Sequence, residues 1–377
     1  MSKPRVLIFT ETALAISETF IANHCRALER YDYVLVTLYG KADHHLDVPI
    51  VRLAGTDRPS ALRRMAFRMG RDPALDRLID RLKPDLVHAH YLPNGVFMRP
   101  YARRYGIPLV VTVHGLDATR RLRSLSVYDQ AYRLGSAALK RDAAVILPVS
   151  DFLRNILMSH GFEPSRLRTH YLGVPMGIAP PLDIKNNPPS ILFVGRLVAK
   201  KGIDIVLEAF AQLKAQRPDA VLHIVGDGPM RDVVDRRAGQ IGSVLVHGAQ
   251  LPDVVQRLMT GARVLVLPSR QARDGDVEGF GLVLAEAQAL GLPVVTSNFG
   301  GTVETILPEQ TGFAVDPTDS AALAAACLRL LDDDLLAATM GGQAYAHARH
   351  HFDLARQTRK LEVIYDDVLA QAAAPWR

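Results

Sequence analysis

Two glutamates, Glu278 and Glu286, stand eight positions apart in the segment EGFGLVLAEAQALG, which runs from residue 278 to residue 291. The residues around Glu286 are almost all apolar, and this composition is typical of a buried helix. A carboxylate in such a helix costs free energy, or its pKa shifts, unless a hydrogen-bond donor satisfies it. We therefore expect Glu286 to bind a ligand, and two vicinal hydroxyls, as on a ribose, meet that need.

Glu278 stands at the entrance to the same segment, slightly more than two helical turns before Glu286. The two carboxylates should therefore project on roughly the same side, so that Glu278 reaches another part of the same ligand. The residues that follow Glu278 should form a loop and the first turn of a helix, with amides that can face a phosphate or sugar hydroxyls. These residues are Gly279, Phe280, Gly281 and Leu282.

A second segment, ILFVGRLVAKKG, places Gly195 and Arg196 directly after an apolar run and Lys201 at the start of the next helix. Glycine lets a ligand approach the backbone, and a guanidinium with an ammonium group suits a diphosphate. The alternative is a glycine turn with surface bases. The segment HIVGDGPM repeats the layout with Gly226, but it lacks the third glycine of a dinucleotide fingerprint, so we predict no nicotinamide site.

Short apolar runs alternate along the chain with longer segments of helical period, which predicts parallel sheets and an α/β fold. Six runs lie in the first half, at 5–10, 33–39, 49–54, 85–90, 108–115 and 144–150. Six more lie in the second half, at 191–195, 222–226, 244–248, 263–268, 293–297 and 312–316. We predict two doubly wound, Rossmann-like domains, 1–178 and 187–356, which face each other across a cleft. Residues 179–186 would form a linker, and a helix over about 357–377 would pack back on the first domain.

Composition narrows the class of protein. The two cysteines, Cys25 and Cys327, are far apart and form no metal-ligand or redox spacing, so we expect buried thiols in a reducing compartment. No apolar run reaches membrane-spanning length, and the N-terminus reads as a first strand rather than a signal peptide. Asp274 and Asp276 form an Asp-x-Asp pair, which we interpret as an acidic, solvated turn rather than a metal site.

Positive charge is concentrated in the first half. Between Val51 and Lys140 there are 17 Lys and Arg against seven Asp and Glu. One interpretation is a solvated basic face. The other is an amphipathic contact with an anionic membrane, because arginines 63, 64, 68 and 71 lie beside apolar residues at helical spacing. Nucleic acid is not expected as a partner, because no recognition motif or aromatic platform accompanies the charge.

Several of these segments together resemble a known family. The segments FVGRLVAKKG, IVGDGP, VHGAQ, VLPSRQARDGDVEGFGLVLAEAQALGLPVVTSNFGGTVETI and TGFAV, in this order, resemble the retaining glycosyltransferases of the two-domain GT-B fold. More narrowly they resemble family 4, also called glycosyl transferases group 1. In the first half, PLVVTVHGLD is similar to a family strand and turn, and SETFIANHCRAL resembles the subgroup that builds exopolysaccharides and other surface glycans.

The resemblance implies a role for each matching residue. Arg196 and Lys201 would hold the donor diphosphate, Glu286 the ribose, and Glu278 the hydroxyls of the donor sugar. The amides of residues 279–282 would face the sugar and phosphates. His114 would lie near the transferred sugar, and Val246 and His247 would line the base pocket. Of these, His114, Glu278, Arg196 and Lys201 are the predicted catalytic residues.

The acceptor side departs from the family pattern. Many relatives have a paired-glycine loop after the first strand, whereas this chain has TETALAISETF, without glycine. Side chains of Ser17, Glu18 and Thr19 would then make contacts that the backbone makes elsewhere. His90, which ends a predicted strand, and Asp117 complete the predicted acceptor side, although His88 and His90 can equally be hydrogen-bonded strand-end histidines.

The function implied is a retaining hexosyltransferase that uses a UDP- or GDP-hexose and a glycan or lipid-linked acceptor in surface polysaccharide assembly. It would need no cofactor or obligatory metal, because Arg196, Lys201 and helix-end amides can stabilise the leaving diphosphate. Its location would be cytoplasmic, peripheral to the inner face of the plasma membrane. Two alternatives stay open: a nucleotide-sugar epimerase on the same fold, and a non-catalytic nucleotide-binding partner of a polysaccharide assembly complex.

Overall fold

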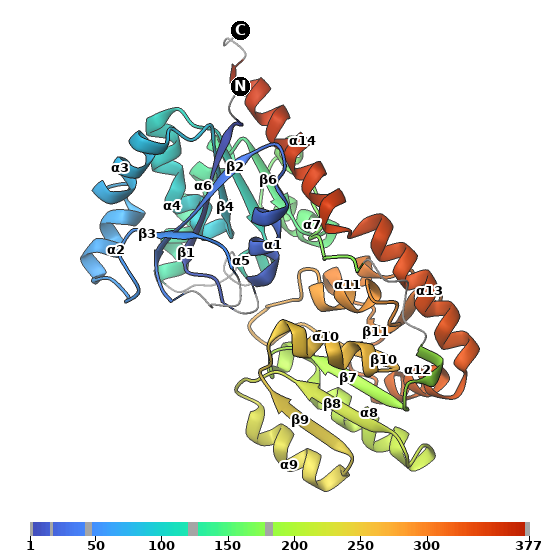
Figure 1. Ribbon diagram of the computed structural model, residues 1–377. Helices are drawn as coiled ribbons and strands as arrows, with labels where there is room; N and C mark the ends of the chain where they lie inside the picture. Colours follow the sequence, from blue (N-terminus) through green and yellow to red (C-terminus); the bar gives the residue numbers. More distant parts are fainter. Residues whose placement is uncertain (1–2, 16–17, 42–46, 120–126, 178–183, 374–377) are drawn as a thin grey trace. The chain divides into compact units, whose positions relative to one another are not determined.

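The computed structural model describes residues 3–15, 18–41, 47–119, 127–177 and 184–373. The chain divides into two compact units, each with its own sheet (Figure 1). Unit 1 comprises Met1–Gly173 and Leu354–Arg377, and unit 2 comprises Val174–Asp353. The chain therefore leaves unit 1 once and returns to it at its last helix.

Unit 1 is built on a six-stranded parallel sheet of order β3-β2-β1-β4-β5-β6. Its strands are β1 (Arg5–Thr12), β2 (Asp32–Tyr39), β3 (Ile50–Arg52), β4 (Leu86–His90), β5 (Leu109–Val113) and β6 (Val145–Pro148). Every residue of β4, β5 and β6 is buried, as expected for continuous apolar runs that are covered on both faces of a sheet.

The connections of unit 1 are helical. They are α1 (Thr19–Ala27), α2 (Ala61–Arg68), α3 (Pro73–Leu82), α4 (Leu92–Tyr105), α5 (Leu116–Thr119), α6 (Val127–Asp142), α7 (Asp151–Ser159) and the 3-10 turn η3 (Pro164–Arg166). Local signals mark several helix starts: the side chains of Ser60, Asp72 and Ser150 accept backbone hydrogen bonds in the first turns of α2, α3 and α7.

Unit 2 repeats the plan with sheet order β12-β11-β10-β7-β8-β9, again all parallel. Its strands are β7 (Ser190–Val194), β8 (Val221–Val225), β9 (Val244–Gly248), β10 (Val264–Leu267), β11 (Val294–Ser297) and β12 (Gly312–Val315). Its helices are α8 (Ile203–Gln216), α9 (Arg231–Ile241), α10 (Pro252–Gly261), α11 (Leu282–Gln288), α12 (Ser320–Asp332) and α13 (Asp334–His351), with 3-10 turns η4 (Ile184–Asn186), η5 (Ala199–Lys201) and η6 (Gly300–Thr305). The prediction of two doubly wound α/β units is confirmed. The strand order reverses between β7 and β10, and ligands of such sheets bind outside the carboxyl ends of the strands at that point.

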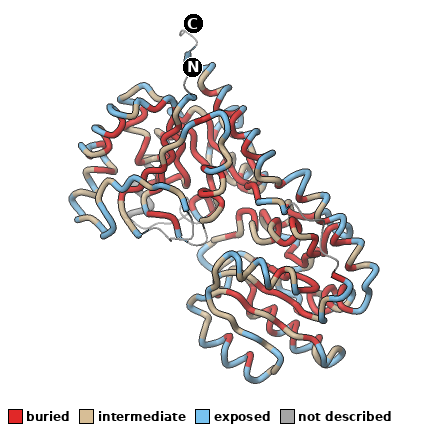
Figure 2. The backbone as a smooth tube through the Cα atoms, in the orientation of Figure 1, coloured by how far each residue is buried: buried red, intermediate tan, exposed pale blue. Residues whose placement is uncertain are grey.

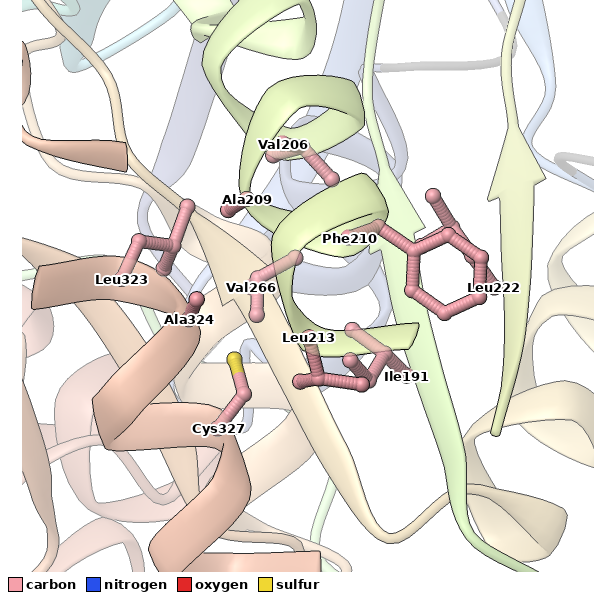
Figure 3. A pocket seen from close by; sticks show the side chains of 10 residues that line it. All are labelled: Ile191, Val206, Ala209, Phe210, Leu213, Leu222, Val266, Leu323, Ala324 and Cys327. Carbon is pink, nitrogen blue, oxygen red and sulfur yellow. The ribbon is translucent and has the colours of Figure 1, made fainter. Parts of the chain in front are cut away.

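The core of unit 2 is tightly packed beneath α8 and α12. The central strands of each sheet are buried (Figure 2), and a cavity of about 10 Å³ lies among these side chains. Figure 3 shows Phe210 and Leu213 of α8, Ile191 of β7 and Cys327 of α12 around it. An apolar space of this size holds at most one water. Cys25 and Cys327 are both buried free thiols, as predicted.

The last helix, α14 (Leu354–Ala373), belongs to unit 1, where it packs against α1. Glu362 of α14 accepts hydrogen bonds from the backbone amides of Glu29 and Arg30, and its other oxygen lies 3.2 Å from the Arg30 Nε. Of the predicted linker 179–186, residues 179–183 lie outside the described residues. Residues 184–186 form η4 in unit 2, with Ile184 fully buried.

Within the described ranges, no helix combines the length and the apolar character that crossing a membrane requires.

Candidate functional site

The loops that follow β7 and β8 lie directly against each other at the carboxyl edge of the unit 2 sheet. The Gly195 amide donates to the Val225 carbonyl at 2.9 Å, and the Gly226 amide donates to the Gly248 carbonyl at 2.8 Å. A Cβ atom on Gly226 would stand 1.9 Å from the Gly195 carbonyl oxygen, and its φ of +137° disfavours other residues. The ends of β7, β8 and β9 are therefore joined, and Gly226 is required for the contact.

Arg196 and Lys201 lie in the segment between β7 and α8. Arg196 is exposed, whereas Lys201 is partly buried at the end of η5. Gly202 then adopts a left-handed conformation, with φ +71°, and precedes α8. A Cβ atom there would stand 2.2 Å from the Pro268 carbonyl oxygen, so glycine brings this turn against the loop that follows β10.

That contact brings Glu278 to Lys201. The Lys201 Nζ lies 2.6 Å from the Glu278 Oε2, and a second pair joins Lys200 and Asp276 at 2.8 Å. Burial would raise the pKa of Glu278, but the positive charges of Lys201, Lys200 and Arg196 outweigh it and lower the pKa to about 2. The structure thus brings the predicted residues Arg196, Lys201 and Glu278 into one electrostatic cluster.

Glu286 lies on α11, the helix that begins after Gly281. Burial raises the pKa of its carboxyl group to about 7, although part of the residue keeps contact with solvent. Within the described part of the chain, no hydrogen bond or ion pair to this carboxyl group is found. It is an acceptor without a donor in a desolvating environment, as the apolar composition of its helix predicts.

The loop over residues 278–281 is held by η6. The Gly301 amide donates to the Glu278 carbonyl at 3.0 Å, and a Cβ atom on Gly301 would stand 1.9 Å from the Gly279 carbonyl oxygen. The Phe280 side chain is buried, with its ring centroid 5.4 Å from that of Phe352. Gly281 has φ +81°, and Leu282 is the first residue of α11. The phenyl ring of Phe280 therefore anchors the loop. Of residue 280, only the backbone is available to a ligand.

Val246 and His247 lie near the end of β9, where the base pocket was predicted, and both are partly buried. The His247 Nε2 lies 3.0 Å from the His223 Nδ1, and the two rings stack at 5.2 Å. Burial and the neighbouring His247 lower the pKa of His223. The His247 carbonyl accepts from the Gln250 Nε2 at 2.6 Å. His223 was not predicted, although the histidines of the two segments HIVG and VHG would have suggested paired strand ends.

The predicted acceptor side lies in unit 1, at the carboxyl ends of β4 and β5. The His90 Nδ1 and the His114 Nε2 are 3.1 Å apart, with the rings stacked at 5.3 Å. Asp117 is buried and accepts the backbone amides of His114, Gly115 and Leu92, at 3.2, 2.8 and 2.9 Å. Asp117 therefore holds the turn that carries His114, and its carboxylate is occupied by the backbone.

Glu18 forms a hydrogen bond with Tyr91, a residue that was not predicted from the sequence. Its two oxygens accept from the Tyr91 hydroxyl at 2.7 Å and from the Ala15 amide at 2.8 Å. Tyr91 follows His90 with a φ of +74°, a strained value for this residue, and its ring lies 4.6 Å from that of His114. Thr19 begins α1, and Ser17 lies outside the described residues.

His88 and the Asp274–Asp276 turn also received predictions. His88 is a satisfied core histidine: its Nδ1 lies 2.6 Å from the Tyr365 hydroxyl and its Nε2 2.7 Å from the Thr112 hydroxyl. His90, in contrast, contacts His114 directly. Asp274 is exposed, as expected of a solvated turn, whereas Asp276 is paired with Lys200, so the solvated interpretation is wrong for Asp276.

Comparison with known proteins identifies the family and the fold of this chain. The family model described as Glycosyltransferase Family 4 matches residues 17–177, and the model described as Glycosyl transferases group 1 matches residues 178–347. The Anabaena protein HepE, solved in complex with UDP and glucose, has a TM-score of 0.77 at 19% identity, covering 97% of this chain and 100% of its own. The GT-B fold is thereby confirmed.

Three curated relatives share more sequence identity with this chain than the Anabaena protein does. WcaL of Salmonella typhimurium, a glycosyltransferase whose name refers to colanic acid biosynthesis, is 32% identical over 64% of this chain and 60% of its own length. The GDP-mannose-dependent alpha-(1-6)-phosphatidylinositol monomannoside mannosyltransferase of Mycolicibacterium smegmatis is 34% identical, over 64% and 66%. The D-inositol 3-phosphate glycosyltransferase of Acidothermus cellulolyticus is 31% identical, over 76% and 68%.

The chain belongs to the glycosyl transferases group 1, within glycosyltransferase family 4. It spans about two thirds of the length of the curated relatives that it matches.

Proposed function

We propose that this protein is a retaining, metal-independent glycosyltransferase that moves a hexosyl group from a UDP- or GDP-hexose to a glycan or lipid-linked acceptor. The observation that carries the proposal is the cluster of Arg196, Lys201 and Glu278 on the same sheet edge as the unpartnered carboxyl group of Glu286. Two cations, an ionised carboxylate and a desolvated carboxyl group match a diphosphate, a sugar and a ribose in one ligand.

The cations are suited to the leaving group. Transfer from a nucleoside diphosphate sugar develops negative charge on the diphosphate and positive charge at the anomeric carbon. Fixed positive charges lower this barrier most when they are oriented before reaction. Lys201 is held by its ion pair with Glu278, and Arg196 is exposed and free to meet the phosphates. We infer that these side chains supply the stabilisation that a metal ion supplies elsewhere.

The two glutamates would bind the donor at different points. Glu278 is ionised at neutral pH and would accept hydrogen bonds from hydroxyls of the donor sugar, while its ion pair keeps Lys201 in place for the phosphate. Glu286 would accept hydrogen bonds from the two ribose hydroxyls, which replace the hydration that burial removes. In unit 1, His114 would lie near the transferred sugar, positioned by the buried Asp117.

The names of relatives support the substrate classes. UDP and glucose bind the Anabaena protein HepE, and the Mycolicibacterium relative is GDP-mannose-dependent and acts on a phosphatidylinositol glycolipid. The relationship to WcaL, together with the segment SETFIANHCRAL, supports a role in surface polysaccharide assembly. An enzyme of that kind would work in the cytoplasm, at the inner face of the plasma membrane.

Calorimetry with UDP and GDP tests the proposal. We expect one of the two nucleotides to bind, and Glu286→Ala and Arg196→Ala each to weaken its affinity at least tenfold, because each removes a hydrogen-bonding group that the ligand would satisfy. Transfer to lipid-linked acceptors should fall by a larger factor. Matched controls are Glu208→Ala and Arg257→Ala, which remove exposed charges from α8 and α10.

Affinity that stays unchanged in both site variants would contradict the proposal. Conversion of the donor to an epimer without acceptor would point to an epimerase, and tight nucleotide binding without transfer to any acceptor would leave only a binding function.

A further inference from the structure

Helix α2 exposes large apolar side chains on one side. Leu62, Met65 and Met69 are 72%, 54% and 55% exposed, and their spacing of three and four residues places them on one face of the helix. Phe67, on the opposite face, is fully buried. The helix is therefore already anchored to unit 1 by Phe67, and a second apolar face points away from the core.

The surroundings of this face are positively charged. From Arg58 to Arg71 the sequence contains five arginines and no aspartate or glutamate. Arg58 and Arg71, which flank the helix, are both exposed. Arg63 and Arg68 form ion pairs with Asp72 and Glu11, so the charge available to a partner comes from the flanking pair and from Arg64, whose guanidinium donates to the Pro59 carbonyl. An exposed apolar stripe with arginines on both sides complements a surface that has an anionic outer layer and an apolar interior.

The position of α2 connects this face to the candidate acceptor side. The Arg63 Nη2 donates to the Leu53 carbonyl, just after β3, and the Arg68 Nη2 donates to the Glu11 Oε1 near the end of β1, both at 2.6 Å. These bonds fix α2 at the carboxyl edge of the sheet, next to β3 (Figure 1). His90 ends β4 at the same edge, and His114 follows β5 there.

We propose that the apolar face of α2, formed by Leu62, Met65 and Met69, docks on an anionic phospholipid bilayer, with Arg58 and Arg71 against its phosphate groups. The three side chains enter the boundary between head groups and acyl chains. The carboxyl edge of unit 1 is then held close to the lipid surface, which favours a lipid-linked acceptor. This last step rests on the proposed function, whereas the docking itself does not.

Co-sedimentation of the full chain with vesicles tests the docking. We expect binding to vesicles of phosphatidylcholine with phosphatidylglycerol, much weaker binding to phosphatidylcholine alone, and weakening by added salt. The combined substitution Leu62→Ser, Met65→Ser and Met69→Ser should reduce binding at least tenfold. A second variant, Arg58→Gln with Arg71→Gln, should reduce binding to the anionic vesicles only.

The matched control is Leu335→Ser on α13 of unit 2, where a leucine is 71% exposed without an apolar neighbour of the same kind. This control should bind vesicles like the wild type. The idea is overturned if the wild type ignores anionic vesicles, or if the triple variant binds them as well as the wild type. It is also overturned if the triple substitution instead dissolves a dimer seen by light scattering, because the face would then meet a second copy.

The two proposals can fail separately. The triple variant should keep the nucleotide affinity of the wild type, since its residues lie in unit 1 and the candidate donor residues lie in unit 2. Vesicle binding together with unchanged nucleotide affinity in both Glu286→Ala and Arg196→Ala would preserve the docking and reject the function. The reverse pattern would reject the docking alone.

Discussion

Glu278 and Glu286 lie in one segment, yet their surroundings shift their pKa values in opposite directions. Three positive charges hold the pKa of Glu278 at about 2, and burial without a partner raises the pKa of Glu286 to about 7. Only the first is fully ionised at neutral pH. Paired carboxylates with separated pKa values are typical of functional sites, because a structural role gives no reason for leaving one of them unsatisfied.

This difference predicts proton release when a nucleotide binds. Hydroxyl donors from a ribose favour the charged form of Glu286 and lower its pKa, so binding near pH 7 should release up to about half a proton from this group. Affinity should accordingly increase as the pH rises through 7. Calorimetry in buffers of different ionisation enthalpy measures the released protons directly, and Glu286→Gln should abolish the part due to this residue.

Glu208→Gln on α8 is the control, since that glutamate is exposed and outside the site. Proton uptake in the wild type, or release of the same size in Glu286→Gln, would show that Glu286 is not the group that meets the ligand.

At the scale of elements, close approach between loops decides which residues the site needs. The turns after β7 and β8 touch through Gly226, and the loop before α11 touches η6 through Gly301. Each contact leaves no space for a side chain. The loops therefore act as one surface, and a change in one of them moves the ligand-binding residues of its neighbour.

Gly226→Ala tests this coupling. The added methyl group would overlap the Gly195 carbonyl, and its backbone conformation is unfavourable for alanine, so the turn that carries Arg196 must shift. We expect a loss of nucleotide affinity of at least tenfold and a lower melting temperature. Gly239→Ala in α9 is the control: it meets no atom within 4 Å, and alanine should stabilise the helix by about 0.5–1 kcal/mol. Equal affinities in the two variants would argue against a coupled surface.

Much of this element plan could be predicted from the sequence. All twelve apolar runs are strands, because a buried parallel strand leaves a continuous apolar signature. Strand order was not predicted, since it depends on pairing between residues far apart. For the same reason the partners His223, Lys200 and Tyr91 were missed: each becomes relevant only when a loop from a different strand is placed beside it.

At the scale of the whole molecule, the two units carry different titratable groups in their interiors. Unit 1 buries His24, His88, His90 and His170, together with the partly exposed His114. Burial lowers the pKa of every one of them, to about 3 for His90 and about 4 for His170. Unit 2 contains groups of both kinds: burial raises the pKa of Glu286 to about 7, and it lowers the pKa of His347 to about 4 and that of His223.

These shifts predict that the two units differ in their sensitivity to acid. A histidine that is neutral in the fold stabilises it fully above pH 6.5, and this stability is lost as the pH falls toward the lowered pKa, because the unfolded chain binds more protons. A glutamate with a raised pKa does the opposite: its charged form destabilises the fold as the pH rises from about 4.5 to about 7. Between pH 6.5 and 5, unit 1 should lose stability through its buried histidines, whereas in unit 2 the gain from Glu286 offsets the loss from His347 and His223.

Hydrogen exchange measured by mass spectrometry reports the stability of each unit separately as the pH changes. The rates must be corrected for the intrinsic pH dependence of exchange. We expect peptides from β4 and β5 to lose more protection between pH 6.5 and 5 than peptides from β7 and β10. His88→Gln supplies a second arm, because it removes a buried titrating group and should reduce the acid sensitivity of unit 1 even if it lowers stability at neutral pH. Equal loss of protection in both units would contradict the predicted difference in acid sensitivity.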